Sequence, residues 1–357
     1  MMKRFFDRLT IFFFLLVLVG GGVWLSLSDA PLMIEEERRQ AAPVPEASYE
    51  AFEKGEYIAA LDAHFLDRLP CRRALLTLYA HTMQKGFANP RIGDIRVCET
   101  TLEKLPPAYD EALLLDNLDT IAHYLSAFLS GKEAYFSLIA HKGHYRGTDS
   151  IYTDAWRTIA EDGRFLPVDT AHTLAYDSYY RGDIHVRAEC YRDFAVSLGQ
   201  AMRFEPTAGL FPVDGREAKG TLAAQIPLGD YTDRFMLLYD ANGVIASANV
   251  YRGESVSGLY RKEPFADPYD VYLGSEQESA LLRIENPQCT SGRRLVLFRD
   301  SYARALVPYL VGAYSEIVVC DLRTPYRTLS DFSSLYADEN TDVLVLVSTY
   351  TVLSTRF

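Results

Sequence analysis

The sequence predicts an α/β fold in which a parallel β-sheet is flanked by helices, preceded by an N-terminal transmembrane helix and a helical region. Three observations predict this arrangement. Continuous runs of branched and aromatic apolar residues occur in the C-terminal part, and such runs are typical of strands buried on both faces. Segments with helical spacing separate these runs, as in proteins whose sheet is covered by helices. A long uncharged stretch lies near the N-terminus.

The overall composition is that of a packed globular protein. Of the 357 residues, 48% are hydrophobic and 24% are charged. The formal net charge is -12, and no basic stripe interrupts this acidic balance. A nucleic-acid-binding protein needs a concentrated basic surface, so the sequence argues against nucleic acid as a partner.

The uncharged stretch at residues 9–28 is long enough to cross a bilayer as a helix. Lys3, Arg4 and Arg8 precede it, which by the positive-inside rule places the N-terminus in the cytosol. Trp24 lies near the other end, where an interfacial anchor is expected. We therefore expect an uncleaved signal-anchor, and a cleaved signal peptide is the alternative.

This anchor divides the chain into four predicted parts: a cytoplasmic N-terminus (1–8), a transmembrane signal-anchor (9–28), a Pro-containing linker (29–48) and one extracytoplasmic domain (49–357). The corresponding location is the cell membrane, with a single span. Whether residues 49–130 form a separate domain or a helical cap on the same core is open. The cap is favoured because strand patterns begin only after this region.

Helical patterns come first within the predicted domain. Residues 49–86 read as helices, with Pro70 in the first turn of the second one, and residues 110–132 as an amphipathic helix that ends near Gly131. Strands and helices then alternate. We expect strands at residues 133–141, 293–300, 316–323 and 341–350, and helices at residues 154–163, 187–202 and 301–315. Residues 164–175 are expected to be irregular. Residues 205–275 are expected to contain strands joined by turns such as Asn242-Gly243.

Five cysteines are too few for a disulfide framework. Outside the cytosol a pair could still oxidise, and Cys71 with Cys98 is the first candidate because both lie in the same subregion. Cys190 and Cys320 fall in apolar segments and are expected to be buried thiols. The cysteine spacing does not match a metal site.

Asp300-Ser301 follows an expected buried strand and precedes an expected helix. Ligands of α/β proteins gather at the carboxyl ends of strands, so Ser301 could be a nucleophile there. Helix-capping is the other explanation for a serine at this junction. A nucleophilic serine needs a base, and His185 is a candidate because Asp183 could orient its imidazole.

The sequence gives little support for a metal site, an ordinary α/β-hydrolase motif or a phosphate-binding loop. His141 and His144 are closely spaced, but without nearby carboxylates a solvated loop is a better interpretation than a metal site. The sequence contains no Gly-x-Ser-x-Gly elbow and no phosphate-binding glycine loop, and we expect no cofactor.

Several segments together resemble one protein family. "YYRGDIHV" resembles the motif region of the DHHW family, a branch of the SGNH hydrolase superfamily related to alginate O-acetylation proteins. "FLDRLPCRRALLTL", "PYDVYLGSEQESALLRIENP", "LVLFRDSYARALVPYLVGAYSEIVVCDLR" and "TDVLVLVSTYTVLSTRF" resemble further segments of that family in the same order. The resemblance covers residues 49 to 357.

The resemblance implies an SGNH-hydrolase-like fold with Ser301 as nucleophile, His185 as base and Asp183 as the orienting carboxylate. It places Gly274 in the oxyanion loop, where its N–H would act beside that of the Ser301–Tyr302 turn. A sixth residue, Arg323, would lie at the edge of the site and contact substrate.

The sequence departs from the family pattern in two places. Ile184 and Val186 stand at the second position and the Trp position of the motif, although Asp183 and His185 are kept. In the oxyanion loop, Gly274-Ser275-Glu276 stands where the family has Gly-Gly-Asn. An ionised Glu cannot donate a hydrogen bond to an oxyanion as Asn can. Stabilisation of the transition state is therefore weakened or left to backbone groups.

The implied function is acetyl transfer to or from hydroxyl groups of a cell-envelope or exopolysaccharide, as an O-acetyltransferase or an acetylesterase. The implied partners are the polysaccharide acceptor and a membrane-bound O-acyltransferase. The departures from the motif motivate an alternative: a non-catalytic protein on the same fold that binds glycan or assembles envelope components.

Overall fold

The structure is a computed structural model. It describes residues 2–27, 33–34, 39–69, 71–129, 132–262, 267–276, 278–323 and 338–357. Contacts within the chain divide it into two compact units. The first comprises residues 1–89 and 224–228, and the second comprises residues 90–223 and 229–357.

The first unit is mainly helical, as expected for residues 49–86. Its elements are α1 (Met2–Leu27), β1 (Met33–Ile34), β2 (Arg39–Gln40), α2 (Tyr49–Glu53), α3 (Glu56–Asp67) and α4 (Arg72–His81). The side chain of Ser48 accepts a hydrogen bond from Ala51 N–H at 3.1 Å and so caps α2. Gly55 takes a left-handed conformation, with φ of 73°, between α2 and α3. Pro70, the predicted first turn of the second helix, lies outside the described residues.

Over the residues that the structure describes, none of the helices combines the length and the apolar character needed to cross a membrane. Residues 9–27 of the predicted span belong to α1, and residue 28 lies outside the described residues.

The second unit contains the sheets and the helices that cover them. Its helices are α5 (Glu111–Phe128), α6 (Ile151–Glu161), α7 (Arg192–Met202), α9 (Val244–Ser247), α10 (Val307–Leu310) and α11 (Thr349–Ser354), while α8 (Thr221–Gln225) spans the boundary between the units in sequence. Its strands are β3 (Arg91–Ile92), β4 (Ile95–Val97), β5 (Leu102–Lys104), β6 (Tyr135–Ile139), β7 (Leu166–Pro167), β8 (Phe211–Lys219), β9 (Thr232–Tyr239), β10 (Asn249–Arg252), β11 (Ser255–Ser257), β12 (Leu281–Glu285), β13 (Arg294–Arg299), β14 (Glu316–Asp321) and β15 (Thr341–Ser348).

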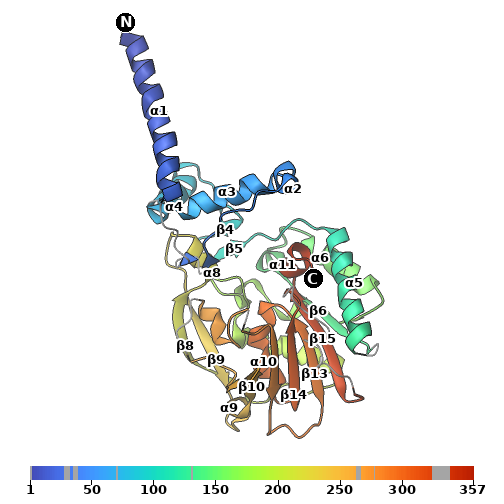
Figure 1. Ribbon diagram of the computed structural model, residues 1–357. Coiled ribbons are helices and arrows are strands. Elements are labelled where there is room, and N and C mark those ends of the chain that lie inside the picture. The colour runs from blue at the N-terminus through green and yellow to red at the C-terminus, as the bar shows by residue number, and fades with distance from the viewer. Residues whose placement is uncertain are drawn as a thin grey trace. The chain divides into compact units, whose positions relative to one another are not determined.

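The main sheet has the order β11-β10-β12-β14-β13-β15-β6-β7. The five strands from β14 to β7 are parallel, which confirms the predicted parallel sheet. The three remaining strands, β12, β10 and β11, extend it in antiparallel fashion. Figure 1 shows β10, β14, β13, β15 and β6 lying side by side.

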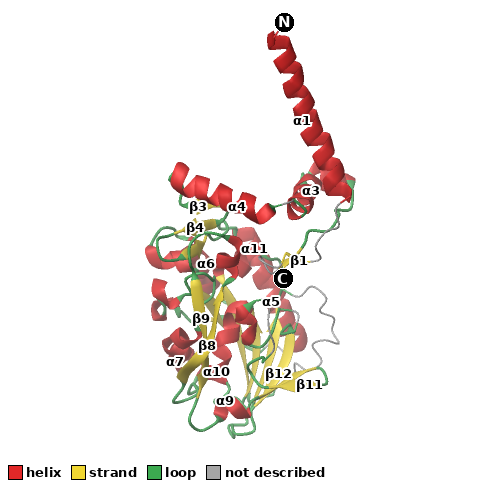
Figure 2. Cartoon of the chain, turned by 90° about the vertical axis from the view of Figure 1, so that its left-hand side faces the viewer, coloured by secondary structure: helices red, strands yellow, loops and turns green. Residues whose placement is uncertain are grey.

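Both faces of the parallel strands are buried, and this explains their continuous apolar sequences. In β13, Leu295 and Leu297 belong to one core, with residues of α7 and α10, while Val296 and Phe298 belong to the other, with residues of α5, α6 and α11. Successive side chains of a strand point to opposite faces, so a strand with a core on each side has apolar residues at successive positions, as at residues 295–298. Figure 2 shows helices of this unit flanking the strands.

Two predicted elements differ from the structure. Residues 301–315 were expected to be one helix, but Ser301–Leu306 form a 3-10 helix and only Val307–Leu310 are α-helical. Pro308 contributes to this difference, because proline cannot donate the backbone hydrogen bond that continues a helix. The predicted loop at His141 and His144 is a 3-10 helix, Lys142–Arg146.

Candidate active site

Ser301 directly follows β13, which lies between β14 and β15 in the parallel part of the sheet. The N-cap of the 3-10 helix is Asp300, not Ser301. Its carboxylate accepts hydrogen bonds from the backbone N–H of Tyr302 at 3.0 Å and of Ser348, on β15, at 2.7 Å. The interpretation of Ser301 as the cap is therefore wrong. With that role taken by Asp300, the Ser301 hydroxyl is free to engage a different partner.

Asp183 and His185 lie on a short loop between two extended segments. Tyr179 and Val186 form an antiparallel bridge across the base of this loop. The N–H of Tyr180 also donates to the carbonyl of His185 at 3.1 Å. This bridge places Asp183 and His185 on one hairpin, which we call the 179–186 hairpin.

Groups from other segments hold the turn of this hairpin. Asp233, on β9, accepts hydrogen bonds from the backbone N–H groups of Arg181 and Gly182, both at 2.7 Å. Gly182 is required by packing, because a Cβ at this position would lie 2.3 Å from the carbonyl oxygen of Tyr231. The close approach of the Tyr231 carbonyl therefore requires a glycine immediately before Asp183.

The structure brings the three predicted catalytic residues into contact. His185 Nδ1 lies 2.6 Å from Asp183 Oδ1, and His185 Nε2 lies 2.9 Å from Ser301 Oγ. A carboxylate can only accept hydrogen bonds, so the ring proton belongs on Nδ1 and Nε2 accepts from the serine hydroxyl. This is the hydrogen-bond pattern of a nucleophile, a base and an orienting acid. Ser301 is 6% exposed and His185 is 4% exposed.

Asp183 is fully buried yet remains ionised. Burial alone would raise the pKa of its carboxyl group. The neighbouring His185, its ring hydrogen bond and the backbone N–H groups of Thr221 (2.7 Å) and His185 (3.0 Å) outweigh that effect and hold this pKa well below its usual range. The charged carboxylate can thus stabilise an imidazolium on His185.

The two expected oxyanion donors, the N–H groups of Gly274 and Tyr302, already donate hydrogen bonds to other groups of the protein. The N–H of Gly274, a residue with φ of 97°, donates to the carbonyl of Asp270 at 2.9 Å. The N–H of Tyr302 donates to Asp300, as described above. A carbonyl and a capping carboxylate thus accept these hydrogen bonds in this conformation, and the predicted role of Gly274 and Tyr302 as oxyanion donors stays a prediction.

Arg323 is paired with acidic side chains. Its guanidinium donates to both carboxylate oxygens of Asp321 (3.0 and 2.8 Å) and to Glu276 at 2.6 Å. Asp321 also pairs with Arg299 at 2.8 Å, a fully buried residue whose pKa is lowered by that burial to about 10. Glu276, the residue that departs from the family pattern, is thus held by Arg323. The predicted substrate contact of Arg323 stays a prediction.

The cysteines are all free thiols, so the expected Cys71–Cys98 disulfide is not formed. The sulfur of Cys98 instead accepts a hydrogen bond from the Arg146 guanidinium at 3.1 Å. Cys320 is buried, as expected, whereas Cys190 is only partly buried. Cys190 lies on a 3-10 helix, Ala188–Tyr191, and packs against the core.

His141 is not in a solvated loop. It is fully buried, and its Nε2 lies 3.2 Å from a carboxylate oxygen of Asp149. The described ranges contain no group of three or more His, Cys, Asp or Glu side chains arranged to hold a metal ion.

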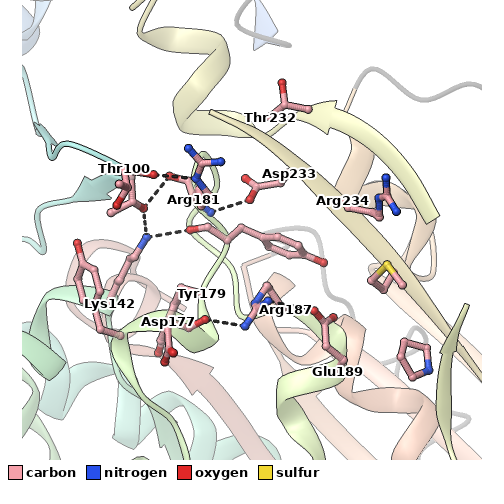
Figure 3. A pocket seen from close by; sticks show the side chains of 15 residues that line it. Thr100, Lys142, Asp177, Tyr179, Arg181, Arg187, Glu189, Thr232, Asp233 and Arg234 are labelled. Atoms are coloured by element: carbon pink, nitrogen blue, oxygen red, sulfur yellow. Dashed lines mark hydrogen bonds and ion pairs between the residues drawn. The ribbon is translucent and has the colours of Figure 1, made fainter. Parts of the chain in front are cut away.

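A pocket of about 580 Å³ lies beside the 179–186 hairpin, and Figure 3 shows the side chains around it. Its wall includes Tyr179 and Arg181 of the hairpin, together with Tyr176 and Arg187 on either side of it in the sequence. Neither the serine, the histidine nor the aspartate of the triad contributes to the wall. Lys142 also lines it, and burial lowers the pKa of this lysine to about 8.

Sequence reasoning missed the residues that surround the imidazole of His185. The ring of Tyr269 is stacked on it, with centroids 3.7 Å apart, and the ring of Tyr302 lies at 4.8 Å. Tyr269 belongs to "PYDVYLGSEQ", one of the segments that resemble the family, but its spacing to His185 in the sequence carries no signal of contact.

Comparisons with solved structures define the class of fold. Over 73% of its length, this chain shares the fold of a DHHW family protein from Eubacterium siraeum, with 18% identity, a TM-score of 0.59 and coverage of 91% of that chain. The resemblance seen in the sequence is thus confirmed at the level of the fold. No family model and no curated protein matches the sequence.

Particular neighbours include two structures of Bacillus cereus PatB1. They have 15% and 16% identity, TM-scores of 0.53 and 0.57, and each comparison covers 73% of this chain and 97% of PatB1; one of the two carries a sulfonyl adduct. The O-acetyltransferase domain of Pseudomonas putida AlgJ is a weaker match, with 12% identity, a TM-score of 0.44 and coverage of 72% of this chain and 91% of that domain.

Proposed function

We propose that this protein transfers acetyl groups to or from hydroxyl groups of a cell-envelope polysaccharide through Ser301, His185 and Asp183. The observation that carries the proposal is the position of His185, which contacts Ser301 Oγ through one ring nitrogen and Asp183 through the other. The family resemblance of the sequence supports the choice of acetyl group and polysaccharide.

In the proposed mechanism, the oxygen of Ser301 attacks the acetyl carbonyl while His185 Nε2 takes the hydroxyl proton. The tetrahedral intermediate collapses, the leaving alkoxide receives this proton from His185, and the acetyl group remains on Ser301 as an ester. A sugar hydroxyl or water then attacks that ester by the same route. The first acceptor completes a transfer, and the second completes a hydrolysis.

We expect slow turnover. Each missing oxyanion donor costs about 10²- to 10³-fold in rate in other acyl-transfer enzymes. The N–H groups of Gly274 and Tyr302 both have acceptors in the present conformation. A membrane-bound O-acyltransferase that exports acetyl groups would be the natural donor partner for such an enzyme.

The test is hydrolysis of p-nitrophenyl acetate by the full-length protein and by its His185→Ala variant. We expect the intact protein to release p-nitrophenolate above the buffer rate and His185→Ala to show no excess release, since without a base the serine stays protonated. His141→Ala is the matched control, because it removes another buried histidine that contacts a carboxylate. Equal release by the intact protein and His185→Ala contradicts the proposal.

A second candidate function is glycan binding without catalysis. The specific observation in its favour is the 580 Å³ pocket, which tyrosine and charged side chains line and which lies outside the serine–histidine contact. Tyrosine rings and charged groups are suited to sugar rings and hydroxyls. A protein that only binds glycan would show no turnover dependent on His185 in the same assay.

We further propose that residues 9–28 anchor the chain in the cell membrane, with residues 29–357 outside the cytoplasm. The support is the uncharged run and the preceding Lys3, Arg4 and Arg8. The full-length protein should remain with the membrane pellet after an alkaline carbonate wash. Its recovery in the supernatant would contradict the anchor.

A further inference from the structure

Two in-plane hydrogen bonds do not by themselves fix the orientation of the His185 ring. The contacts at Nδ1 and Nε2 define a line through the imidazole, and the ring can still rock about that line. Tyr269 blocks this motion, because its ring lies parallel to the imidazole, with an interplanar angle of 5° and a centroid separation of 3.7 Å. The tilted ring of Tyr302, at 52°, approaches the same imidazole.

Tyr269 is itself held firmly. Its side chain is fully buried, its backbone N–H donates to Asp267 at 2.9 Å, and its hydroxyl donates to the carbonyl of Tyr302 at 3.3 Å. The guanidinium of Arg304 lies over the phenol ring, 4.9 Å from its centroid. Since the imidazole covers one face of the ring, the guanidinium occupies the other, where a cation–π contact is favourable.

Hydrogen bonds also connect Asp267, which holds Tyr269, to Asp183. The second oxygen of Asp267 accepts a hydrogen bond from the hydroxyl of Thr221 at 3.1 Å. The backbone N–H of Thr221 donates to Asp183 Oδ2 at 2.7 Å. Asp183, at the edge of the imidazole, and Tyr269, on its face, are thus connected through Thr221 and Asp267.

We propose that Tyr269 is a positioning residue that acts through His185, an inference that rests on the proposed function of Ser301, His185 and Asp183. Tyr269 holds the imidazole so that Nε2 faces the serine hydroxyl at 2.9 Å. Proton transfer depends steeply on this geometry, and a displacement of about 1 Å can cost about 10²-fold in rate. The tyrosine is needed for its flat ring, while its hydroxyl contributes a weaker contact to a backbone carbonyl.

The test compares Tyr269→Leu and Tyr269→Phe in the p-nitrophenyl acetate assay with full-length protein. We expect Tyr269→Leu to lower kcat by about 10- to 100-fold with KM within about twofold, because the ring acts on proton transfer and not on substrate binding. Tyr269→Phe keeps the stack and should retain kcat within about threefold. Tyr314→Leu is the control: this tyrosine is also buried, and its ring packs against Phe204.

Full kcat in Tyr269→Leu would overturn the inference, and so would an equal loss of kcat in Tyr314→Leu, which would indicate a general packing effect. If Tyr269→Leu does not fold, Tyr269→Phe decides: retained kcat supports the role of the ring, and a loss of tenfold or more overturns it. These outcomes are distinct from failure of the proposed function, in which the unmodified protein itself shows no turnover dependent on His185.

Discussion

Ser301→Ala is expected to reduce kcat/KM for p-nitrophenyl acetate by about 10⁴-fold or to the buffer rate, whichever is reached first. The substitution removes the nucleophilic oxygen, which lies 2.9 Å from His185 Nε2 in a site where the serine is 6% exposed. The rate of p-nitrophenolate release, measured against substrate concentration for both proteins, checks this expectation.

Ser137→Ala is the matched control for this loss. Its hydroxyl is also buried and hydrogen-bonded, to Thr170 at 2.8 Å, but it lies on β6 and has no contact with His185. Both variants remove one oxygen from a buried serine, so their costs in folding should be similar. If Ser301→Ala kept full esterase activity, or formed the same acetylated product, the nucleophile would lie elsewhere.

Asp183→Asn is expected to lower kcat/KM by about 10³- to 10⁴-fold, because an amide can donate to Nδ1 and favour the wrong tautomer of His185. The neutral amide also cannot stabilise the imidazolium that forms during proton transfer. Because the pKa of Asp183 is held well below its usual range, its carboxyl group stays ionised from pH 5 to pH 8, and a loss should be seen across this range. Kinetics across this range check the expectation.

Asp233→Asn provides a matched control for Asp183→Asn. Both carboxylates are buried and accept hydrogen bonds from backbone N–H groups of the same hairpin, but Asp183 contacts the imidazole and Asp233 contacts Arg181 and Gly182. Equal losses in the two variants would assign the effect to the hairpin fold and not to orientation of His185.

The lowered pKa of Asp183 also has a consequence for folding. A carboxylate with a depressed pKa stabilises the folded state above its unfolded pKa, about 4, and this contribution is lost as the pH falls through the folded value. The difference in unfolding free energy between the unmodified protein and Asp183→Asn should therefore shrink below pH 4.

The parallel strands could be predicted from the sequence because burial on both faces requires an unbroken apolar run. The runs at residues 293–300, 316–323 and 341–350 correspond to β13, β14 and β15. The antiparallel half was not predicted as part of the same sheet. β12 has a less apolar sequence, with Arg283 exposed at its centre, and strand direction depends on long-range pairing that local patterns do not record.

The candidate site was predicted only in part. Ser301, His185 and Asp183 could be named because strand and turn signals made them candidates and the family resemblance assigned their roles. The oxyanion donors could not, because whether the N–H of Gly274 is free depends on the carbonyl of Asp270 in the folded loop. Tyr269 could not be found either, since its role is defined by a ring contact with a residue 84 positions away in the chain.

The central claim is that His185 activates the hydroxyl of Ser301 as a nucleophile. Its most direct test is to treat the full-length protein with a sulfonyl fluoride and locate the covalent adduct by peptide mass mapping. The account predicts a single adduct on Ser301 that is lost in His185→Ala and kept in His141→Ala. An adduct on another residue, or labelling of Ser301 that is unchanged by His185→Ala, would contradict it.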